Sequence, residues 1–141
     1  MKGNRTTVSD NTVIPDSHKD LLESTALAHV ATIGPNGGPH VNPVWFGWDG
    51  DLISFSQTKS RQKLRNLQKD NRISLSIVDP VNPYRYLEVR GKAIEVIEDP
   101  DKAFIDSMAQ KYLGQEKYPW SQPGDQRVIV VVEPERALTM G

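Results

Sequence analysis

Residues 56–67 carry the side chains in this sequence whose types and spacing are best suited to binding an anion. The stretch reads Ser-Gln-Thr-Lys-Ser-Arg-Gln-Lys-Leu-Arg-Asn-Leu, so a strand-like run leads into a helical pattern whose buried side is marked by Leu64 and Leu67. Four cations project from the remaining surface: Lys59, Arg61, Lys63 and Arg65. They form two like-charged pairs four residues apart, and the repulsion in each pair costs roughly a few tenths of a kcal/mol unless an anion relieves it.

Two interpretations of this stretch stay open at this point. A helix that begins near Thr58 or Ser60 would point free backbone N–H groups at the same place as the cations, which would make an anion site. A run of basic residues is, however, most often a solvated helix face. The basic stretch alone does not separate the two.

The composition limits the classes of protein to which the chain can belong. It has 141 residues, 17 basic and 18 acidic side chains and a formal net charge of −1, so a general nucleic-acid binder is not expected. The lack of cysteine excludes disulfides and thiolate chemistry, so redox chemistry would need a bound cofactor. No apolar run reaches transmembrane length, and we expect a cytoplasmic protein without a membrane segment. A mobile N-terminal segment is expected over residues 1–15 and a single domain over residues 16–141.

The hydrophobic pattern and the turn residues predict mainly β structure. Strands are expected over residues 28–34, 39–47, 52–57, 72–78, 84–98 and 127–133. Gly91, in the middle of the longest strand, predicts a bulge or bend. Helices are expected over residues 17–26, over the basic stretch, and from Asp99 to Gly114, with Asp99 as the cap and Pro100 as the first helical residue. These elements describe a predominantly antiparallel β-barrel with peripheral helices.

The three histidines do not form a metal-ligand pattern, so no metal site is expected. His18 is interpreted as an exposed helix residue, and His29 and His40 as partners across the turn at residues 35–38. The sequence also lacks the glycine-rich and nucleophile motifs of common hydrolases, nucleotide triphosphatases and dinucleotide-binding enzymes.

Aromatic residues mark two further candidate regions. Pro43, within the run Asn-Pro-Val-Trp-Phe at residues 42–46, cannot donate a ladder hydrogen bond, so a planar ligand could approach the backbone there. An edge strand with a buried Trp45 explains the same residues. Trp120, in the late loop, can be a packing residue or a lid. Tyr-Arg-Tyr at residues 84–86 is either an ordinary cross-strand aromatic set or part of a site.

Three motifs in this order resemble the split-barrel flavin- and deazaflavin-binding superfamily, the pyridoxamine 5′-phosphate oxidase-like group. They are the strand at residues 42–46, the strand-to-helix motif at residues 56–67 with Arg-x-Lys-x-x-Asn-Leu, and the strand that follows Asp70-Asn71-Arg72. The resemblance covers nearly the whole chain from about His18. It implies a six-stranded, antiparallel split β-barrel, a homodimer, and two cofactor sites in grooves between the subunits.

The resemblance also implies which residues hold the cofactor. The phosphate or tail ligands would come from the strand-to-helix motif, namely Thr58, Lys59, Arg61 and Lys63, with Ser56 and Asn66 nearby in the binding site. The ring would be bordered by Asn42, Val44, Trp45 and Phe46. A third group would reach the ring, from the same subunit or from the other one: Tyr84, Arg85, Tyr86 and Leu87. No catalytic residue is assigned.

The chain departs from true pyridoxamine phosphate oxidases at its end, residues 135–141, which argues against that substrate. Its length and cationic turn are more similar to the subgroup that uses the deazaflavin coenzyme F420. The resemblance thus implies an F420-dependent reductase that transfers a hydride to an electron-poor double bond of a small organic substrate. An FMN-dependent oxidoreductase of the same fold, and a non-catalytic binder of flavin, deazaflavin or haem, are the alternatives.

Overall fold

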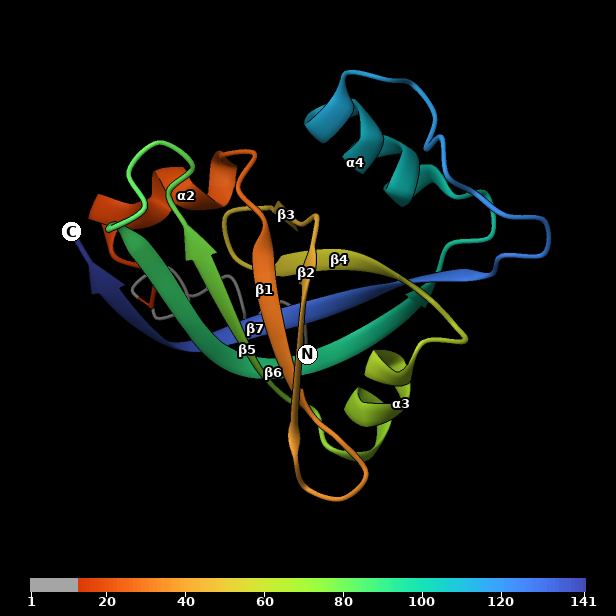
Figure 1. The fold of residues 1–141 in the computed structure, drawn as a ribbon, viewed down its shortest axis with the longest axis horizontal. Helices are drawn as coiled ribbons and strands as arrows, with labels where there is room; N and C mark the ends of the chain where they lie inside the picture. Colours follow the sequence, from red (N-terminus) through yellow and green to blue (C-terminus); the bar gives the residue numbers. More distant parts are fainter. Residues whose placement is uncertain (1–12) are drawn as a thin grey trace.

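The structure, a computed structural model, describes residues 13–141, and its main element is one antiparallel sheet (Figure 1). In the described residues seven strands follow the order β2-β1-β5-β6-β7-β4-β3. The strands are β1 (Ala28–Ile33), β2 (Pro39–Val44), β3 (Gly47–Trp48), β4 (Ile53–Thr58), β5 (Arg72–Val78), β6 (Tyr86–Glu98) and β7 (Arg127–Met140). The predicted class, mainly β with antiparallel pairing, is confirmed.

The two edge strands of the sheet are consecutive in the chain, and only Trp45 and Phe46 separate them. The sheet therefore curls until its first and last strands come near each other without pairing, which makes a split barrel and not a closed one. The sequence predicted one strand over residues 39–47. It is divided into β2 and β3, so the structure has seven strands where the resemblance implied six.

Apolar side chains of alternate strand positions fill the inside of the curled sheet. Phe46, Phe55, Ile77, Leu87 and Val130 are among the side chains with no exposed surface. Such close-packed side chains fix the register of the strands, because a slip by one residue would turn them outward.

Gly91 has the role that its place in the sequence predicted. The β6–β7 register shifts between Arg90 and Gly91, and a Cβ atom at Gly91 would lie 2.0 Å from the carbonyl oxygen of Glu133. Only glycine allows the two backbones to come this close. Beyond this irregularity β7 continues to Met140, seven residues further than predicted, and covers the full length of β6.

Within residues 13–141, the helical elements beside the sheet are η2 (Asp16–His18), α2 (Lys19–Glu23), α3 (Gln62–Lys69) and α4 (Ala103–Leu113). In Figure 1, α4 lies above the right-hand part of the sheet and α3 below it. The helix α4 starts later than predicted. Asp99 does act as a cap, since its Oδ2 accepts the N–H of Phe104 at 3.1 Å, but Pro100 lies in the preceding turn and is not helical. Gly114 ends the helix with φ +70°, as predicted.

The N-terminal part of the domain departs from two predictions. Of the expected mobile segment, residues 1–12 lie outside the described residues, whereas Ile14 belongs to the core and is 5% exposed. His18 is buried, not exposed: its ring is held by the Ser17 hydroxyl at 2.7 Å and donates from Nε2 to the Met140 carbonyl at 3.1 Å. The ring thereby links η2 to the end of β7. Among the described residues, no helix has the length and apolar character needed to cross a membrane.

Candidate functional site

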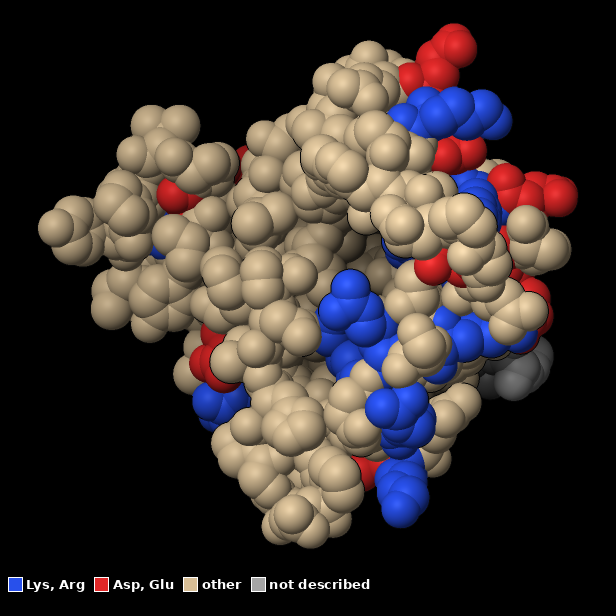
Figure 2. All heavy atoms as spheres, turned by 45° about the vertical axis from the view of Figure 1, so that its right-hand side comes forward, with Lys and Arg blue, Asp and Glu red and all other residues tan. Residues whose placement is uncertain are grey.

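A cavity of about 540 Å³ lies between β2, β4 and the start of α3, where the barrel is split. This size is in the range of small-molecule and cofactor sites. Figure 2 shows the hollow, with Lys and Arg side chains along one side of it. Its lining residues are Leu27, Thr32, His40, Asn42, Pro43, Val44, Trp45, Ser56, Gln57, Thr58, Arg61, Gln62, Lys63, Ile105, Tyr118, Trp120 and Arg127.

One end of the cavity is cationic. Arg61, Lys63 and Arg127 line it, and no described lining residue is an aspartate or a glutamate. Lys63 extends from the first turn of α3, and its ammonium donates to the neutral Gln57 side chain at 3.0 Å. Burial and then the nearby Arg61 lower the pKa of Lys63 to about 8. A partly desolvated ammonium with only an uncharged partner is an energetic cost that a bound anion would relieve.

Arg127 is the second component of this cationic end, and β7 places it there. It is the first residue of β7 and pairs with Thr58 at the end of β4. Its guanidinium donates to the Ser56 hydroxyl at 3.1 Å and lies 4.8 Å from the ring centre of Tyr118. The Nε of Arg127 is buried and has no hydrogen-bond partner among the described residues. The guanidinium of Arg127 therefore has donor capacity that the described residues do not use.

The other end of the cavity is aromatic. Trp45, from the split between β2 and β3, lies near Tyr118 and Trp120 of the loop between α4 and β7. Behind it, Tyr112 of α4 stacks on Trp45 with ring centres 5.2 Å apart and planes within 6°. The Tyr112 hydroxyl donates to the Ala26 carbonyl at 2.8 Å. Trp45 therefore has one face covered by a fixed ring.

A polar network at the start of α3 holds His40 at the cavity wall. Asn66 is buried, and its amide nitrogen donates to the Thr32 hydroxyl at 3.0 Å and lies 3.1 Å from Nδ1 of His40. Gln62 donates to the Asn66 side-chain oxygen at 2.8 Å. Gly34 leaves room for the imidazole, since a Cβ there would lie 2.4 Å from Nε2 of His40. His40 pairs with Thr32 across the hairpin, and His29 pairs with Pro43, so the predicted His29–His40 pairing is wrong.

The structure brings together about half of the residues that were predicted to bind the cofactor. Seven of them line the cavity: Asn42, Val44, Trp45, Ser56, Thr58, Arg61 and Lys63. The other seven do not: Phe46, Lys59, Asn66, Tyr84, Arg85, Tyr86 and Leu87. Phe46 is fully buried in the core, and Lys59 precedes α3 and forms an ion pair with Glu98 at 2.7 Å. Asn66 does not line the cavity, but its side chain contacts His40, which does.

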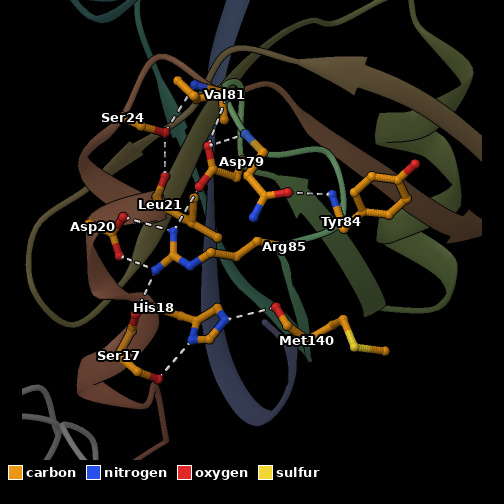
Figure 3. A network of polar contacts seen from close by, with 12 residues as sticks. Ser17, His18, Asp20, Leu21, Ser24, Asp79, Val81, Tyr84, Arg85 and Met140 are labelled. Carbon is orange, nitrogen blue, oxygen red and sulfur yellow. Dashed lines mark hydrogen bonds and ion pairs between the residues drawn. The ribbon is translucent and has the colours of Figure 1, made fainter.

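The predicted group at residues 84–87 lies away from the cavity in this chain. Arg85 forms ion pairs with Asp20 at 2.7 Å and Asp79 at 3.0 Å and donates to the Ser17 carbonyl at 2.6 Å (Figure 3). Its contacts join α2 to the loop between β5 and β6. Leu87 belongs to the core, while Tyr84 is 83% exposed. Any contact of these residues with a cofactor would have to involve a second subunit.

Sequence reasoning missed Arg127 and Tyr118. Arg127 reaches the site only because β7 pairs with β4, a contact between residues about seventy positions apart. No local pattern signals it. For Tyr118 a signal was present, because the same aromatic loop segment had drawn attention to Trp120 two residues later.

The fold and the cavity define a split-barrel protein whose pocket has cationic and aromatic walls. Over residues 14–141 the chain matches the family described as pyridoxamine 5′-phosphate oxidase, and it belongs to that family.

Solved structures agree with this assignment. A protein named F420 reductase is 39% identical, with a TM-score of 0.81 over 89% of this chain and 98% of its own. A conserved hypothetical protein from Mycobacterium tuberculosis is 26% identical, with a TM-score of 0.71 over 91% of this chain and 85% of its own. HupZ from Group A Streptococcus, 22% identical with a TM-score of 0.64, covers 89% of this chain and 93% of its own and shows the shared fold. No curated protein matches the chain.

Proposed function

We propose that the chain is an F420-dependent reductase that transfers a hydride from the reduced deazaflavin to an electron-poor double bond of a small organic substrate. The observation that carries this proposal is the charge of the cavity: three cationic side chains and no acidic one among the described lining residues. F420 carries a phosphate and a carboxylate-rich tail beside a flat ring. The 39% identity to a protein named F420 reductase supports the deazaflavin ring over the flavin ring of FMN.

The residues of the cavity fit such a group. Arg61, Lys63 and Arg127 would hold the phosphate, because charge-assisted hydrogen bonds to phosphate are strong when partly desolvated. When bound, the deazaflavin supplies the hydride chemistry, and the protein orients it and shields it from water.

The aromatic end and the edge of β2 would do the orienting. Pro43 lines the cavity and has no N–H, so a flat ring can approach the strand beside it. Trp45, backed by Tyr112, excludes water from one side. The described lining holds no carboxylic acid, so the product would take its proton from solvent or from a lining side chain such as the Lys63 ammonium or the Tyr118 hydroxyl.

We further propose that the chain forms a homodimer with the cofactor sites between its subunits. Large apolar side chains that nothing in the described chain covers support this: Val41 is 66% exposed, Val81 90% and Tyr84 83%. In such a dimer, Tyr84 and Tyr86 would reach the partner's cofactor. Light scattering should then give twice the chain mass of 15.8 kDa. A monomer that binds F420 tightly would contradict the shared site.

Equilibrium titration with F420 and, separately, with FMN tests the cofactor. We expect saturable F420 binding that weakens with rising salt, because the contacts are ionic. Tight FMN binding without F420 binding would instead make the protein an FMN-dependent oxidoreductase. Turnover of a panel of enones and quinones with reduced F420 separates a reductase from a carrier of flavin, deazaflavin or haem, which would bind without turnover.

A further inference from the structure

His40 lines the cavity from β2, and one nitrogen of its imidazole is not used by any described residue. Its Nδ1 lies 3.1 Å from the amide nitrogen of Asn66, whereas Nε2 has no hydrogen-bond partner within residues 13–141. A neutral imidazole carries one N–H and one lone pair, and the hydrogen bond of one nitrogen decides which of the two the other nitrogen presents. The orientation of the Asn66 amide therefore sets what His40 offers to a bound molecule.

A series of side-chain hydrogen bonds that begins at Arg65 fixes this orientation. A guanidinium has only donors, so the Gln62 atom that Arg65 contacts at 2.8 Å is the oxygen. The Gln62 nitrogen then donates to Asn66 at 2.8 Å, which makes the facing Asn66 atom the oxygen. The Asn66 nitrogen is left to donate to the Thr32 hydroxyl at 3.0 Å and to His40 at 3.1 Å. Because Nδ1 of His40 accepts this hydrogen bond, the proton of the neutral ring is on Nε2.

The edge of the ring that carries Nε2 is free of backbone contacts. A Cβ at Gly34 would lie 2.4 Å from Nε2 of His40, 2.8 Å from Cε1 and 3.0 Å from Cδ2. Since the two neighbouring carbons are nearly as close as Nε2, Gly34 lies over the face of the imidazole and not in its plane, where the Nε2–H points. His40 is exposed in the open cavity. A ligand that covers the ring would meet a neutral donor whose direction is fixed.

We propose that Asn66 is a positioning residue that holds His40 as the Nε2–H tautomer, and that His40 donates this hydrogen bond to a carbonyl oxygen on the ring of the bound cofactor. A neutral donor favours an uncharged acceptor, whereas the cations at the other end of the lining favour the phosphate. The deazaflavin ring has such carbonyl oxygens. The identity of the ring rests on the proposed reductase function, but the tautomer of His40 does not.

Nitrogen-15 NMR of the cofactor-free protein, labelled at histidine and recorded at pH 8.5, tests the tautomer. Protonated and unprotonated imidazole nitrogens resonate far apart, and His40→Gln identifies the His40 signals by their loss. We expect a protonated Nε2 and an unprotonated Nδ1. His18, whose Nε2 donates to the Met140 carbonyl, provides a reference for this tautomer in the same spectrum. A protonated Nδ1 at His40 would overturn the proposal.

Replacing Gln62 by glutamate tests whether Asn66 sets the tautomer. The new carboxylate has only acceptors, so the Asn66 amide has to turn its nitrogen towards position 62 and its oxygen towards His40. The Thr32 hydroxyl can donate as well as accept and allows this turn. The His40 proton should then move to Nδ1, although no hydrogen bond joins Gln62 to His40. Gln68→Glu adds the same charge to α3 at an exposed position outside the cavity lining and should leave the tautomer unchanged. An unchanged tautomer in Gln62→Glu would refute the role of Asn66.

Titration of two His40 variants with F420 tests the donor. His40→Leu removes the N–H, so the F420 Kd should rise about three- to tenfold, the range expected for one neutral hydrogen bond. The side chain in His40→Gln can accept from Asn66 and donate near the position of Nε2, and it should keep the Kd within about twofold of the wild type. Saturating F420 should also shift the Nε2 resonance of His40 in the wild type.

The outcomes separate this inference from the proposed function. If His40→Leu binds F420 as tightly as the wild type, the donor role is refuted and the reductase proposal stands. An equal loss of affinity in His40→Leu and His40→Gln would show that the shape of the imidazole matters and would also refute the donor. If the wild type does not bind F420, the reductase proposal is refuted, and the spectrum of Gln62→Glu still decides whether Asn66 positions His40.

Discussion

Replacing Lys63 by methionine should weaken cofactor binding and, at the same time, stabilise the cofactor-free protein. The two effects have one origin. The ammonium is partly desolvated, has Gln57 as its neutral partner at 3.0 Å, and lies 5.7 Å from the centre of the Phe55 ring. Burial lowers the pKa of Lys63 to about 8, so the folded protein disfavours the charged form that an anion requires. Methionine has similar length and would pack against Phe55.

The size of the binding effect follows from the contact that is lost. A charge-assisted hydrogen bond to a partly desolvated phosphate contributes about 1.5–3 kcal/mol, so the F420 Kd should rise about 10- to 150-fold. Wild-type affinity should also fall as the pH rises above about 8, where free Lys63 loses its proton. If the protein with charged Lys63 binds F420 about 30-fold more tightly than the protein with neutral Lys63, bound F420 raises the pKa of Lys63 by about 1.5 units. The decrease in affinity should therefore level off about 1.5 pH units above the pKa of the free protein. The methionine variant should lack this pH dependence.

Stability should respond in the opposite sense. Because the pKa of Lys63 is about 8 in the folded chain and about 10.5 in the unfolded chain, the unfolded state binds more protons between these values. The free energy of unfolding of the wild type should therefore rise with pH over this interval. Urea denaturation of the methionine variant should show higher stability at pH 7 and no such rise.

A matched variant provides the control. Lys69 ends α3, is exposed and does not line the cavity, so Lys69→Met removes the same charge from the same helix. It should leave the F420 Kd within about twofold at moderate salt. If Lys63→Met binds F420 as tightly as the wild type, or if both variants lose affinity equally, the assignment of Lys63 to the phosphate is refuted.

Two further substitutions test the scaffold. Arg85→Ala removes the partner that lowers the pKa of Asp20 and that, after the N–H groups of Val81 and Asn82, also lowers the pKa of Asp79. We expect a lower urea midpoint and a smaller loss of stability on acidification below about pH 4, with an unchanged F420 Kd. A large Kd increase at unchanged stability would return Arg85 to the cofactor site. Gly91→Ala places a Cβ 2.0 Å from the Glu133 carbonyl oxygen, so the unfolding free energy should fall by about 3 kcal/mol; a loss below about 0.5 kcal/mol would show that the two strands can separate easily.

Local patterns predicted the strands well, because each is bounded by turn chemistry that the sequence displays. The hairpin between β1 and β2 and the glycine that ends α4 are set by residues close in sequence. Gly91 marked the β6 irregularity by its type alone, although the backbone that requires a glycine there is that of Glu133 in β7. The cationic stretch contributes Arg61 and Lys63 to the cavity lining.

The errors came from contacts between distant residues. Whether a cation faces a ligand or a carboxylate depends on its neighbours in space, and Lys59 is paired with Glu98 of β6. Burial of His18 depends on the carbonyl of Met140, at the far end of the chain. Arg127 entered the site through the pairing of β4 with β7. None of these contacts follows from a regular spacing of residues along the chain, so a single sequence did not reveal them.

The prolines of β2 have a consequence for the solubility of a protein with a split sheet. An open edge strand presents unpaired backbone groups and can recruit a strand from another molecule, which leads to aggregation. Pro39 and Pro43 lie two positions to either side of Val41, so these three residues direct their backbone groups to the same edge. Since proline lacks an N–H, the backbone pairing of β2 with β1 runs through the residues between these three positions. Of the three outward-directed residues, only Val41 then has a backbone N–H to offer on the outer edge. The open side of the barrel beside β2 is thus accessible to a small flat molecule, but the edge of β2 is a poor template for a strand of another molecule.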